Sequence, residues 1–493
     1  MSKPYSHHSG FDLKGAARRA VLDAGFEPEL DSAAKAQLDK ISGPAPVVPD
    51  IKDLRDKPWS SIDNKESRDL DQIEYAEKLP NGDVRLVVGI ADVDALVPKG
   101  SPLDKHAFAN CTSVYTGVDV FPMLPEKLST DCTSLNEGED RVIIAIETVV
   151  DANGEVASYD VYRAIGRNNA KLAYDDVGEW LDSGGTLDKV TDNGILTQQL
   201  QLQAEASKRL KDERARNGAL EFDTIEATPI AKDGKVVDLR VIHKNRARDL
   251  IEDFMIASNV AIARFLEARG RSGIRRVVRE PERWDRIVEL AARYGEKLPT
   301  EPSSLALSQF LIKRRSADPD RFPDLSTSIV KLMGPGIYAL DLPGTDPGGH
   351  FGLATHDYTH ATAPNRRYAD LVTQRLVKAV LENAPPPYSD DELSAIAKQC
   401  TEREDAENKV ERKVRKTVAA LLLSDRIGDS FDAIVTGAGS KATFVRTVHP
   451  PAEGMVVRGQ KGFDVGDKVR VKLVRADPQK SYIDFEGQGE RGN

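Results

Sequence analysis

Residues 61–74 read SIDNKESRDLDQIE, and three aspartates stand in this short stretch: Asp63, Asp69 and Asp71. Three segments in which apolar and polar residues alternate follow it: DVRLVVGIADV (83–93), RVIIAIETVV (141–150) and, after the turn DANGEV, ASYDVYRAI (157–165). Alternation with period two is typical of half-buried strands, and a short Asn-Gly turn between two such runs indicates a hairpin. The region 61–165 is therefore predicted to form mainly a β-sheet.

From about residue 170 to 425 the spacing of apolar residues becomes helical. They recur every three to four positions in five segments: 193–216, 246–269, 281–295, 365–383 and 391–425. A strand pair around the turn KDGK interrupts this pattern near 219–243, and NAPPPYS at 383–389 marks a sharp break. Strands followed by helices predict an α+β fold.

The two ends of the chain differ from this centre. Residues 428–487 contain five short β-rich runs separated by Gly, Asp and Pro, which is the size and rhythm of an OB-fold barrel. Residues 11–24 and 32–41 have helical spacing and predict a small module over 1–42. This module is either similar to a helix-turn-helix or winged helix, or it packs on its neighbours without a role of its own. The Pro-rich segment 43–60 is predicted to be a linker.

Composition narrows the class of protein. The 493 residues include 69 Lys or Arg and 79 Asp or Glu, a formal net charge of −10, with 40% hydrophobic and 30% charged residues. These values predict about three globular domains and exclude a disordered or disulfide-rich chain. No apolar run approaches the roughly 20 residues of a membrane helix, and the first residues lack the apolar core of a signal peptide. Three cysteines without a CxxC pair favour a reducing compartment. We expect a cytoplasmic monomer that does not contact membranes.

The aspartate-rich stretch has the chemistry of a metal site. If residues 69–71 are extended, the side chains of Asp69 and Asp71 point to the same face. Several carboxylates share a buried site only when a cation is present, because like charges raise one another's pKa. Oxygen ligands that leave room for water and phosphate suit Mg²⁺. Zinc is not favoured, because no carboxylate or cysteine completes a tetrahedral set with the loop histidines His350, His356 and His360. Taken alone, however, an acidic loop is more often a solvated turn.

Longer motifs connect the chain to a known family. They are RLVVGIADVD (85–94), SPLDKHAFANCTSVYTGVDVFPMLPEKLSTDCTSLNEGEDR (101–141), AKLAYDDVGEWLD (170–182) and HFGLATHDYTHATAPNRRYADLVTQRL (350–376). In this order they resemble the catalytic domain of the ribonuclease II/R family, the RNB nucleases, over 61–427. The resemblance implies a multidomain α+β protein. A mixed sheet surrounded by helices would precede an RNA-binding OB-fold barrel at 428–487, and a helical module would stand in place of the family's cold-shock domains. The sequence after the barrel, DFEGQGERGN, is not rich in lysine and favours the ribonuclease II type.

The resemblance also assigns the metal loop. Asp63, Asp69 and Asp71 match three of the family's four catalytic aspartates, which hold one or two Mg²⁺ ions. The fourth position is Gln72, whose amide oxygen can ligate a metal but carries no charge. The resemblance makes Asp69, Asp71 and Arg366 the catalytic residues, and Gln72 leaves the second metal site open.

Six further residues are implied to bind RNA. Arg367 stands beside Arg366 at a helix start, where guanidinium groups can hold a phosphate. Tyr115 and Phe222 match two rings of the family that clamp the terminal base, and Tyr174 matches a tyrosine deeper along the RNA path. Glu252 and Glu411 match two glutamates that contact ribose hydroxyls. Base stacking tolerates any sequence, and an acceptor at the 2′-OH selects RNA over DNA. Without the family, these would be core aromatics and helix-surface charges.

The resulting prediction is a Mg²⁺-dependent, processive 3′→5′ exoribonuclease that hydrolyses single-stranded RNA, or RNA with a 3′ overhang, to nucleoside 5′-monophosphates in RNA turnover. The alternative, motivated by Gln72, is an RNA-binding pseudo-nuclease that has lost turnover. A third interpretation, an acidic structural protein with an incidental barrel, predicts no affinity for RNA.

Overall fold

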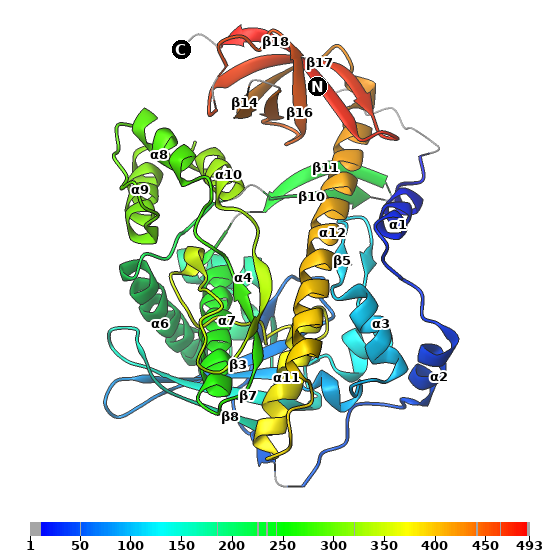
Figure 1. Cartoon of the computed structure of the whole chain (residues 1–493), viewed down its shortest axis with the longest axis vertical. Helices are drawn as coiled ribbons and strands as arrows, with labels where there is room; N and C mark the ends of the chain where they lie inside the picture. The colour runs from blue at the N-terminus through cyan, green and yellow to red at the C-terminus, as the bar shows by residue number, and fades with distance from the viewer. Residues whose placement is uncertain are drawn as a thin grey trace.

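The computed structural model describes residues 11–490, apart from residues 50, 185, 224–225, 233–234, 243, 320, 440–441 and 464. A mixed sheet with its helices lies at one end of the molecule, a β-barrel lies at the other, and a long helix runs between them (Figure 1). The α+β architecture expected from the sequence is confirmed. Among the described residues, no helix is both long and apolar enough to cross a membrane.

The main sheet has five strands in the order β1-β8-β7-β4-β3. They are β1 (Lys52–Asp53), β3 (Gln72–Lys78), β4 (Val84–Ala91), β7 (Asp140–Val150) and β8 (Val156–Arg167). All neighbours pair antiparallel except β1, which runs parallel to β8. Gly154, in the turn between β7 and β8, has a φ of 87°, and a Cβ there would stand 1.9 Å from the Arg209 carbonyl oxygen. Only glycine fits this turn, which keeps β7 and β8 in register.

The described residues also form four two-stranded sheets. Their pairs are β2 (Ser61–Asp63) with β9 (Lys171–Ala173), β5 (Val114–Tyr115) with β6 (Val120–Phe121), β10 (Glu226–Lys232) with β11 (Lys235–Ile242), and β12 (Gly273–Val277) with β13 (Ile337–Asp341). The hairpin predicted near 219–243 is therefore present, although its tip at 233–234 lies outside the described residues.

Helices cover the sheet and, together with it, form the body of the molecule, residues 52–423. Two long helices, α6 (Gly194–Arg216) and α7 (Arg246–Glu267), pack on each other and on the sheet, with Phe254 and Phe265 of α7 buried in the main core. The others are α3 (Pro102–Asn110), α4 (Tyr174–Ser183), α5 (Asp188–Thr191), α8 (Trp284–Arg293), α9 (Ser304–Ala317), α10 (Phe322–Met333), α11 (Tyr368–Leu381) and α12 (Asp390–Leu423). Short helical turns complete the body: η1 (Val93–Ala95), η2 (Lys127–Cys132), η3 (Phe351–Leu353) and η4 (Ser424–Arg426). Helices α8, α9 and α10 have a separate core of their own.

The C-terminal strands close into a barrel in the order β14-β15-β16-β18-β17. They are β14 (Ser430–Ala438), β15 (Thr443–Thr447), β16 (Glu453–Arg458), β17 (Lys468–Asp477) and β18 (Tyr482–Glu490). Phe431 and Phe485 meet edge to face inside the barrel, with ring centroids 6.3 Å apart. The barrel interior belongs to the same hydrophobic cluster as the end of α12, so the barrel is packed onto this helix.

The two N-terminal helices pack on different parts of the molecule. α1 (Leu13–Asp23) lies against α12 and joins the barrel cluster through Ala17 and Val21. α2 (Ser32–Lys40) lies against α3 and contributes Ala34 to the core of the main sheet. The helices themselves were predicted correctly, but they dock separately on the body and the barrel instead of packing on each other as a helix-turn-helix pair would.

Candidate active site

The residues of the predicted metal loop come from the ends of two strands. β2 ends at Asp63, and β3 begins at Gln72, directly after Asp71. Reciprocal backbone hydrogen bonds between Ser60 and Glu74, of 3.1 and 2.8 Å, connect the segment before β2 to β3. The Gln72 Nε2 donates a hydrogen bond of 3.1 Å to the Asp63 Oδ1, so two of the four predicted ligand positions are in direct contact.

Asp71 is buried but has polar contacts on both carboxylate oxygens. Its side chain faces the segment before α11, where the Asn365 backbone N–H donates to Oδ1 at 3.1 Å. The Arg366 Nε lies 3.8 Å from Oδ2. Burial raises the pKa of Asp71 to about 7, although the charge of Arg366 and the bond from Asn365 act in the opposite direction. Asp71 and Arg366, which are 295 positions apart in the sequence, thus form one site.

Asp63 has an incompletely paired carboxylate. Burial raises the pKa of Asp63 to about 6, while the hydrogen bond from Gln72 and the charge of Lys171 lower it. Within the described part of the chain, its Oδ2 is buried and has no hydrogen-bond partner. A buried carboxylate oxygen without a donor is a position that a cation can fill.

Asp69 contacts one of the rings predicted to hold RNA. The Tyr115 hydroxyl donates a hydrogen bond of 2.9 Å to the Asp69 Oδ2. Burial, followed by the charge of Asp69, raises the pKa of the Tyr115 hydroxyl well above its usual value, so it remains a donor. Tyr115 ends β5 and is 36% exposed, which leaves part of its ring open for stacking.

The oxygen donors fit a hard divalent cation better than a soft one. In the described ranges, no three His, Cys, Asp or Glu side chains stand close enough together to hold a metal as they are. The Oδ2 of Asp63 has no hydrogen-bond partner in the described part of the chain, and burial disfavours the charged forms of Asp63 and Asp71, which a bound cation would favour. Carboxylate ligands of this kind suit Mg²⁺.

The two arginines before α11 differ in their contacts. Arg367 forms a bidentate ion pair with Asp370, with distances of 2.9 Å from Nε and 2.7 Å from Nη2, and Asp370 is fully buried. The Arg366 side chain is 44% exposed and extends beside Asp71. Arg366 is therefore placed to meet a phosphate, whereas the Arg367 guanidinium already has an internal partner.

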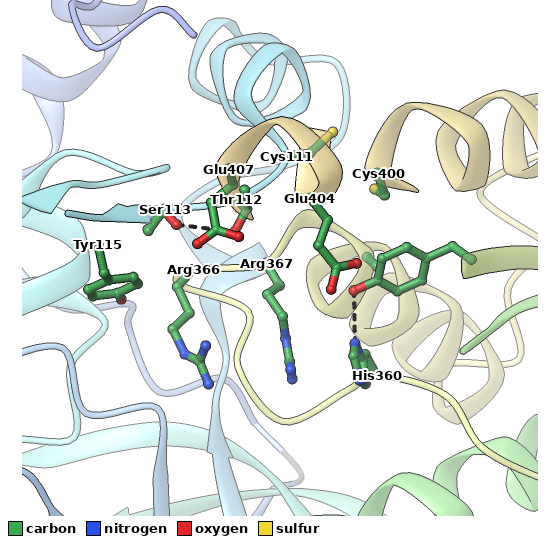
Figure 2. A pocket seen from close by; sticks show the side chains of 12 residues that line it. Cys111, Thr112, Ser113, Tyr115, His360, Arg366, Arg367, Cys400, Glu404 and Glu407 are labelled. Atoms are coloured by element: carbon green, nitrogen blue, oxygen red, sulfur yellow. Dashed lines mark hydrogen bonds between the residues drawn. The ribbon is translucent and has the colours of Figure 1, made fainter. Parts of the chain in front are cut away.

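A cavity of about 180 Å³ opens beside Arg366 (Figure 2). Figure 2 shows Tyr115 on one side of this cavity, both arginines entering from a single loop, and Glu404 and Glu407 entering from α12. The residues that line it are Cys111, Thr112, Ser113, Tyr115, Tyr338, His360, Arg366, Arg367, Ala369, Cys400, Glu404 and Glu407. The predicted base-stacking ring and the predicted phosphate-binding arginine thus face one space.

One turn of α12 carries two glutamates toward this cavity. Glu411, predicted to contact ribose, lies four residues after Glu407, and burial and the charge of Glu411 raise the pKa of Glu407 to about 9. Glu404, on the same face, forms a bidentate ion pair with Arg276 at 2.5 and 2.7 Å. Sequence reasoning missed Glu407, although its i, i+4 relation to Glu411 could have revealed it.

Four of the predicted RNA-binding residues do not line this cavity: Phe222, Tyr174, Glu252 and Glu411. Phe222 packs on the core of α8–α10 and, with Glu252, lines a second cavity of about 350 Å³. The Glu252 carboxylate pairs with the Lys244 Nζ at 2.9 Å. The Tyr174 ring lies 4.5 Å from the guanidinium carbon of Arg248. Tyr115 and Phe222, expected to clamp one base, therefore line different cavities.

Sequence profiles of two domains match the chain. The RNB domain matches residues 51–383, and the RNase II-type exonuclease C-terminal S1 domain matches residues 429–488. The sequence is similar to ribonuclease R 1 of Lactococcus lactis, with 29% identity over 97% of this chain and 61% of that protein. It is also similar to ribonuclease R of Thermotoga maritima, with 32% identity over 88% of this chain and 64% of that protein. The chain thus spans less than two thirds of the length of these relatives.

The fold is also found among solved structures. RNase R of Mycoplasma genitalium, in complex with ribose-methylated single-stranded RNA, superimposes with a TM-score of 0.87 at 23% identity, over 97% of this chain and 78% of that one. These relatives carry the name ribonuclease R, while the S1 profile is described by RNase II. The expected closeness to ribonuclease II stays a prediction, as do the domain limits at 42, 60 and 427.

Proposed function

Because the chain belongs to the RNB family, we propose that it is a Mg²⁺-dependent 3′→5′ exoribonuclease that processively hydrolyses single-stranded RNA to nucleoside 5′-monophosphates. The observation that carries this proposal is the meeting of Asp71, Arg366 and Tyr115 beside one cavity. A carboxylate for the metal, a cation for the phosphate and a ring for the base are the three groups that such a reaction needs.

Each residue has a separate task in this proposal. The exposed Arg366 guanidinium offsets charge that develops on the scissile phosphate, and the Asn365 backbone N–H keeps Asp71 oriented. Tyr115 stacks on the terminal base, with its hydroxyl held by Asp69. Glu411 accepts a hydrogen bond from a ribose 2′-OH, which selects RNA.

Asp63, Asp69 and Asp71 would hold Mg²⁺, with the Gln72 amide beside them. When bound, Mg²⁺ activates water and stabilises the leaving oxygen. The buried Oδ2 of Asp63, which has no hydrogen-bond partner in the described part of the chain, supports this assignment. The proposed substrates are single-stranded RNA and RNA with a 3′ overhang, and a monomeric enzyme acting in the cytoplasm remains our expectation.

One assay tests the reaction and its direction together. Single-stranded RNA labelled at its 3′ end should release a labelled nucleoside 5′-monophosphate from the first turnover when Mg²⁺ is present, and none with EDTA. The same RNA labelled at its 5′ end should shorten progressively. Binding without release would identify the pseudo-nuclease, and a lack of RNA affinity would support the acidic structural protein instead.

A further inference from the structure

Glu74 is a buried carboxylate that the proposed reaction does not yet use. It lies on β3, is 0% exposed, and neither of its carboxylate oxygens has a hydrogen-bond partner in the described part of the chain. A lone carboxylate in such a position destabilises the fold, and an apolar residue of similar size would not. A partner that binds after folding explains why a glutamate stands there.

The geometry of β3 directs Glu74 toward the metal loop. Residues two apart on a strand project from the same face, so Glu74 shares the face of Gln72. Gln72 donates to Asp63, and the nearby Asp63 carboxylate is the charge that acts on Glu74. Asp63 also has an unpaired oxygen. The buried Glu74 and the partly buried Asp63 thus have three buried oxygens without a hydrogen-bond partner in the described part of the chain.

Position 72 provides the complementary observation. The Gln72 side chain is 8% exposed, and its amide N–H₂ faces Asp63 as a donor. In this orientation Gln72 neutralises one oxygen of Asp63 but contributes no negative charge of its own. An acidic residue at position 72 would supply a negative charge, which the Gln72 amide lacks. A carboxylate stands instead two residues later, at Glu74.

We propose that Glu74 supplies the fourth carboxylate of the divalent-metal site, in place of position 72. Together with Asp63, Asp69 and Asp71, Glu74 would hold the cation. A carboxylate contributes a full charge where an amide contributes only a dipole, and this difference is large at a buried site. This inference rests on the proposed function, because the cation is the one that the nuclease reaction requires.

Metal binding can be measured without turnover. In the 493-residue chain, Mn²⁺ serves as the probe, and electron paramagnetic resonance of free Mn²⁺ gives its affinity and stoichiometry. We expect Glu74→Gln to weaken Mn²⁺ binding by about tenfold or more, and Gln72→Asp to restore it in the Glu74→Gln background. Glu77→Gln is the matched control, since Glu77 is on the same strand but pairs with Lys57 and Arg85.

Thermal unfolding provides a second readout. Without metal, Glu74→Gln should melt no lower than the wild type, because it removes an unpartnered buried carboxyl group, while Mn²⁺ should raise the melting temperature of the wild type more than that of Glu74→Gln. If Glu74→Gln does not fold, Glu74→Asp keeps the charge and should weaken binding less than tenfold.

The outcomes separate this inference from the proposed function. Unchanged Mn²⁺ affinity in Glu74→Gln would overturn the role of Glu74, as would a loss that Gln72→Asp does not restore. A wild-type protein that neither binds Mn²⁺ nor releases mononucleotides would instead overturn the proposed function itself.

Discussion

The Asp71 carboxylate is buried beside the Arg366 guanidinium and accepts a hydrogen bond from the Asn365 backbone N–H. We predict that Asp71→Asn lowers mononucleotide release by more than about 1,000-fold, a loss of the size seen when one member of a catalytic unit is removed. RNA affinity should change little, because the carboxylate acts on the metal and the transition state more than on bound RNA. Single-turnover rates and filter binding separate the two effects. Asp176→Asn, at an exposed position of α4, is the control, and full activity of Asp71→Asn would refute the assignment.

Arg366 and Arg367 allow a paired test of neighbouring side chains. Arg366→Ala should lower kcat by about 100-fold or more, which is the usual effect of removing a transition-state donor, with a much smaller change in RNA affinity. Arg367→Ala should instead destabilise the fold, because it leaves the buried Asp370 without its ion pair. Steady-state kinetics and urea unfolding of both variants give the comparison. Equal losses of kcat and affinity in Arg366→Ala would make Arg366 a general phosphate contact.

Part of the site was predictable from the sequence, and part was not. The spacing of Asp63, Asp69 and Asp71 and the family motifs led to the metal loop. Glu74 was missed because a glutamate in an alternating strand has the pattern of a solvent-facing residue, and its burial depends on what covers that face. Phe222 was assigned by resemblance, but its position is set by packing on α8–α10.

At the level of single elements, the turn η3 depends on a neutral histidine. The His350 Nδ1 accepts a hydrogen bond of 3.1 Å from the Leu353 backbone N–H, and the ring packs against Tyr358. Burial, followed by the charge of Arg276, lowers the pKa of His350 to about 4 from its ordinary 6.5. Below pH 6.5 the unfolded chain therefore takes up a proton that the folded protein does not, and stability falls as the pH drops toward 4.

We predict that His350 accounts for a loss of about 2 kcal/mol in unfolding free energy between pH 7 and pH 5. His350→Asn retains an acceptor for the Leu353 N–H but does not titrate, so its unfolding free energy should fall less over this range. Urea unfolding at both pH values measures the difference. Parallel pH profiles for the two proteins would show that His350 is not the responsible group.

The basic residues of the barrel have unequal roles in the structure. Arg446 pairs with the buried Asp324 at 3.0 Å, Arg470 pairs with Asp432 at 2.7 Å, and Lys441 lies outside the described residues. Lys468 and Lys472 are exposed and project from the same face of β17. These two lysines are the better candidates for contact with RNA phosphates.

We predict that Lys468→Gln and Lys472→Gln together weaken RNA binding and reduce the slope of log affinity against log salt by about 1.4, since each phosphate contact on single-stranded RNA accounts for about 0.7. Slow mononucleotide release should persist, because the catalytic cavity is elsewhere. Titrations at several salt concentrations measure the slope. Lys398→Gln on α12 is an exposed lysine control, and an unchanged slope would mean that this face of β17 does not contact RNA.

Elements built from local pairing were easier to predict than those built from distant segments. The strands β4, β7 and β8 have clear alternation and short connections, and all were anticipated. β12 and β13 were not, because they pair Gly273–Val277 with Ile337–Asp341 across intervening helices and lie in a region that reads as helical. For α1 and α2, periodicity identified the helices but contains no information about their partners.

At the scale of the whole molecule, the barrel and the catalytic body share buried surface through α12. Leu423, near the end of this helix, is 0% exposed and belongs to the barrel cluster. Removing residues 428–493 would therefore expose the apolar face of α12 as well as delete RNA contacts, so the truncation is a less specific test than the lysine substitutions.

We predict that Leu423→Ala destabilises the whole protein by about 2–5 kcal/mol in a single transition. Trp59, Trp180 and Trp284 are the three tryptophans of the chain and all lie in the catalytic body, so their fluorescence reports on a region distant from the substitution. Thermal unfolding followed by fluorescence should shift with Leu423→Ala. A fluorescence transition that stays at the wild-type temperature would show that the barrel unfolds on its own.

The length of α12 also sets a fixed distance within the molecule. Its 34 residues form one uninterrupted helix, which at about 1.5 Å per residue spans roughly 50 Å from the sheet to the barrel (Figure 1). The cavity lies part-way along this helix, beside Glu407, so a strand held there can touch the barrel only when it covers the 16 residues from Glu407 to Leu423, roughly 24 Å. RNAs below that length should bind equally to the wild type and to the protein with both barrel lysines replaced, and longer RNAs should distinguish them. A series of oligonucleotides of increasing length gives the length at which the two affinities diverge. This length measures the distance that the helix sets between the cavity and the barrel.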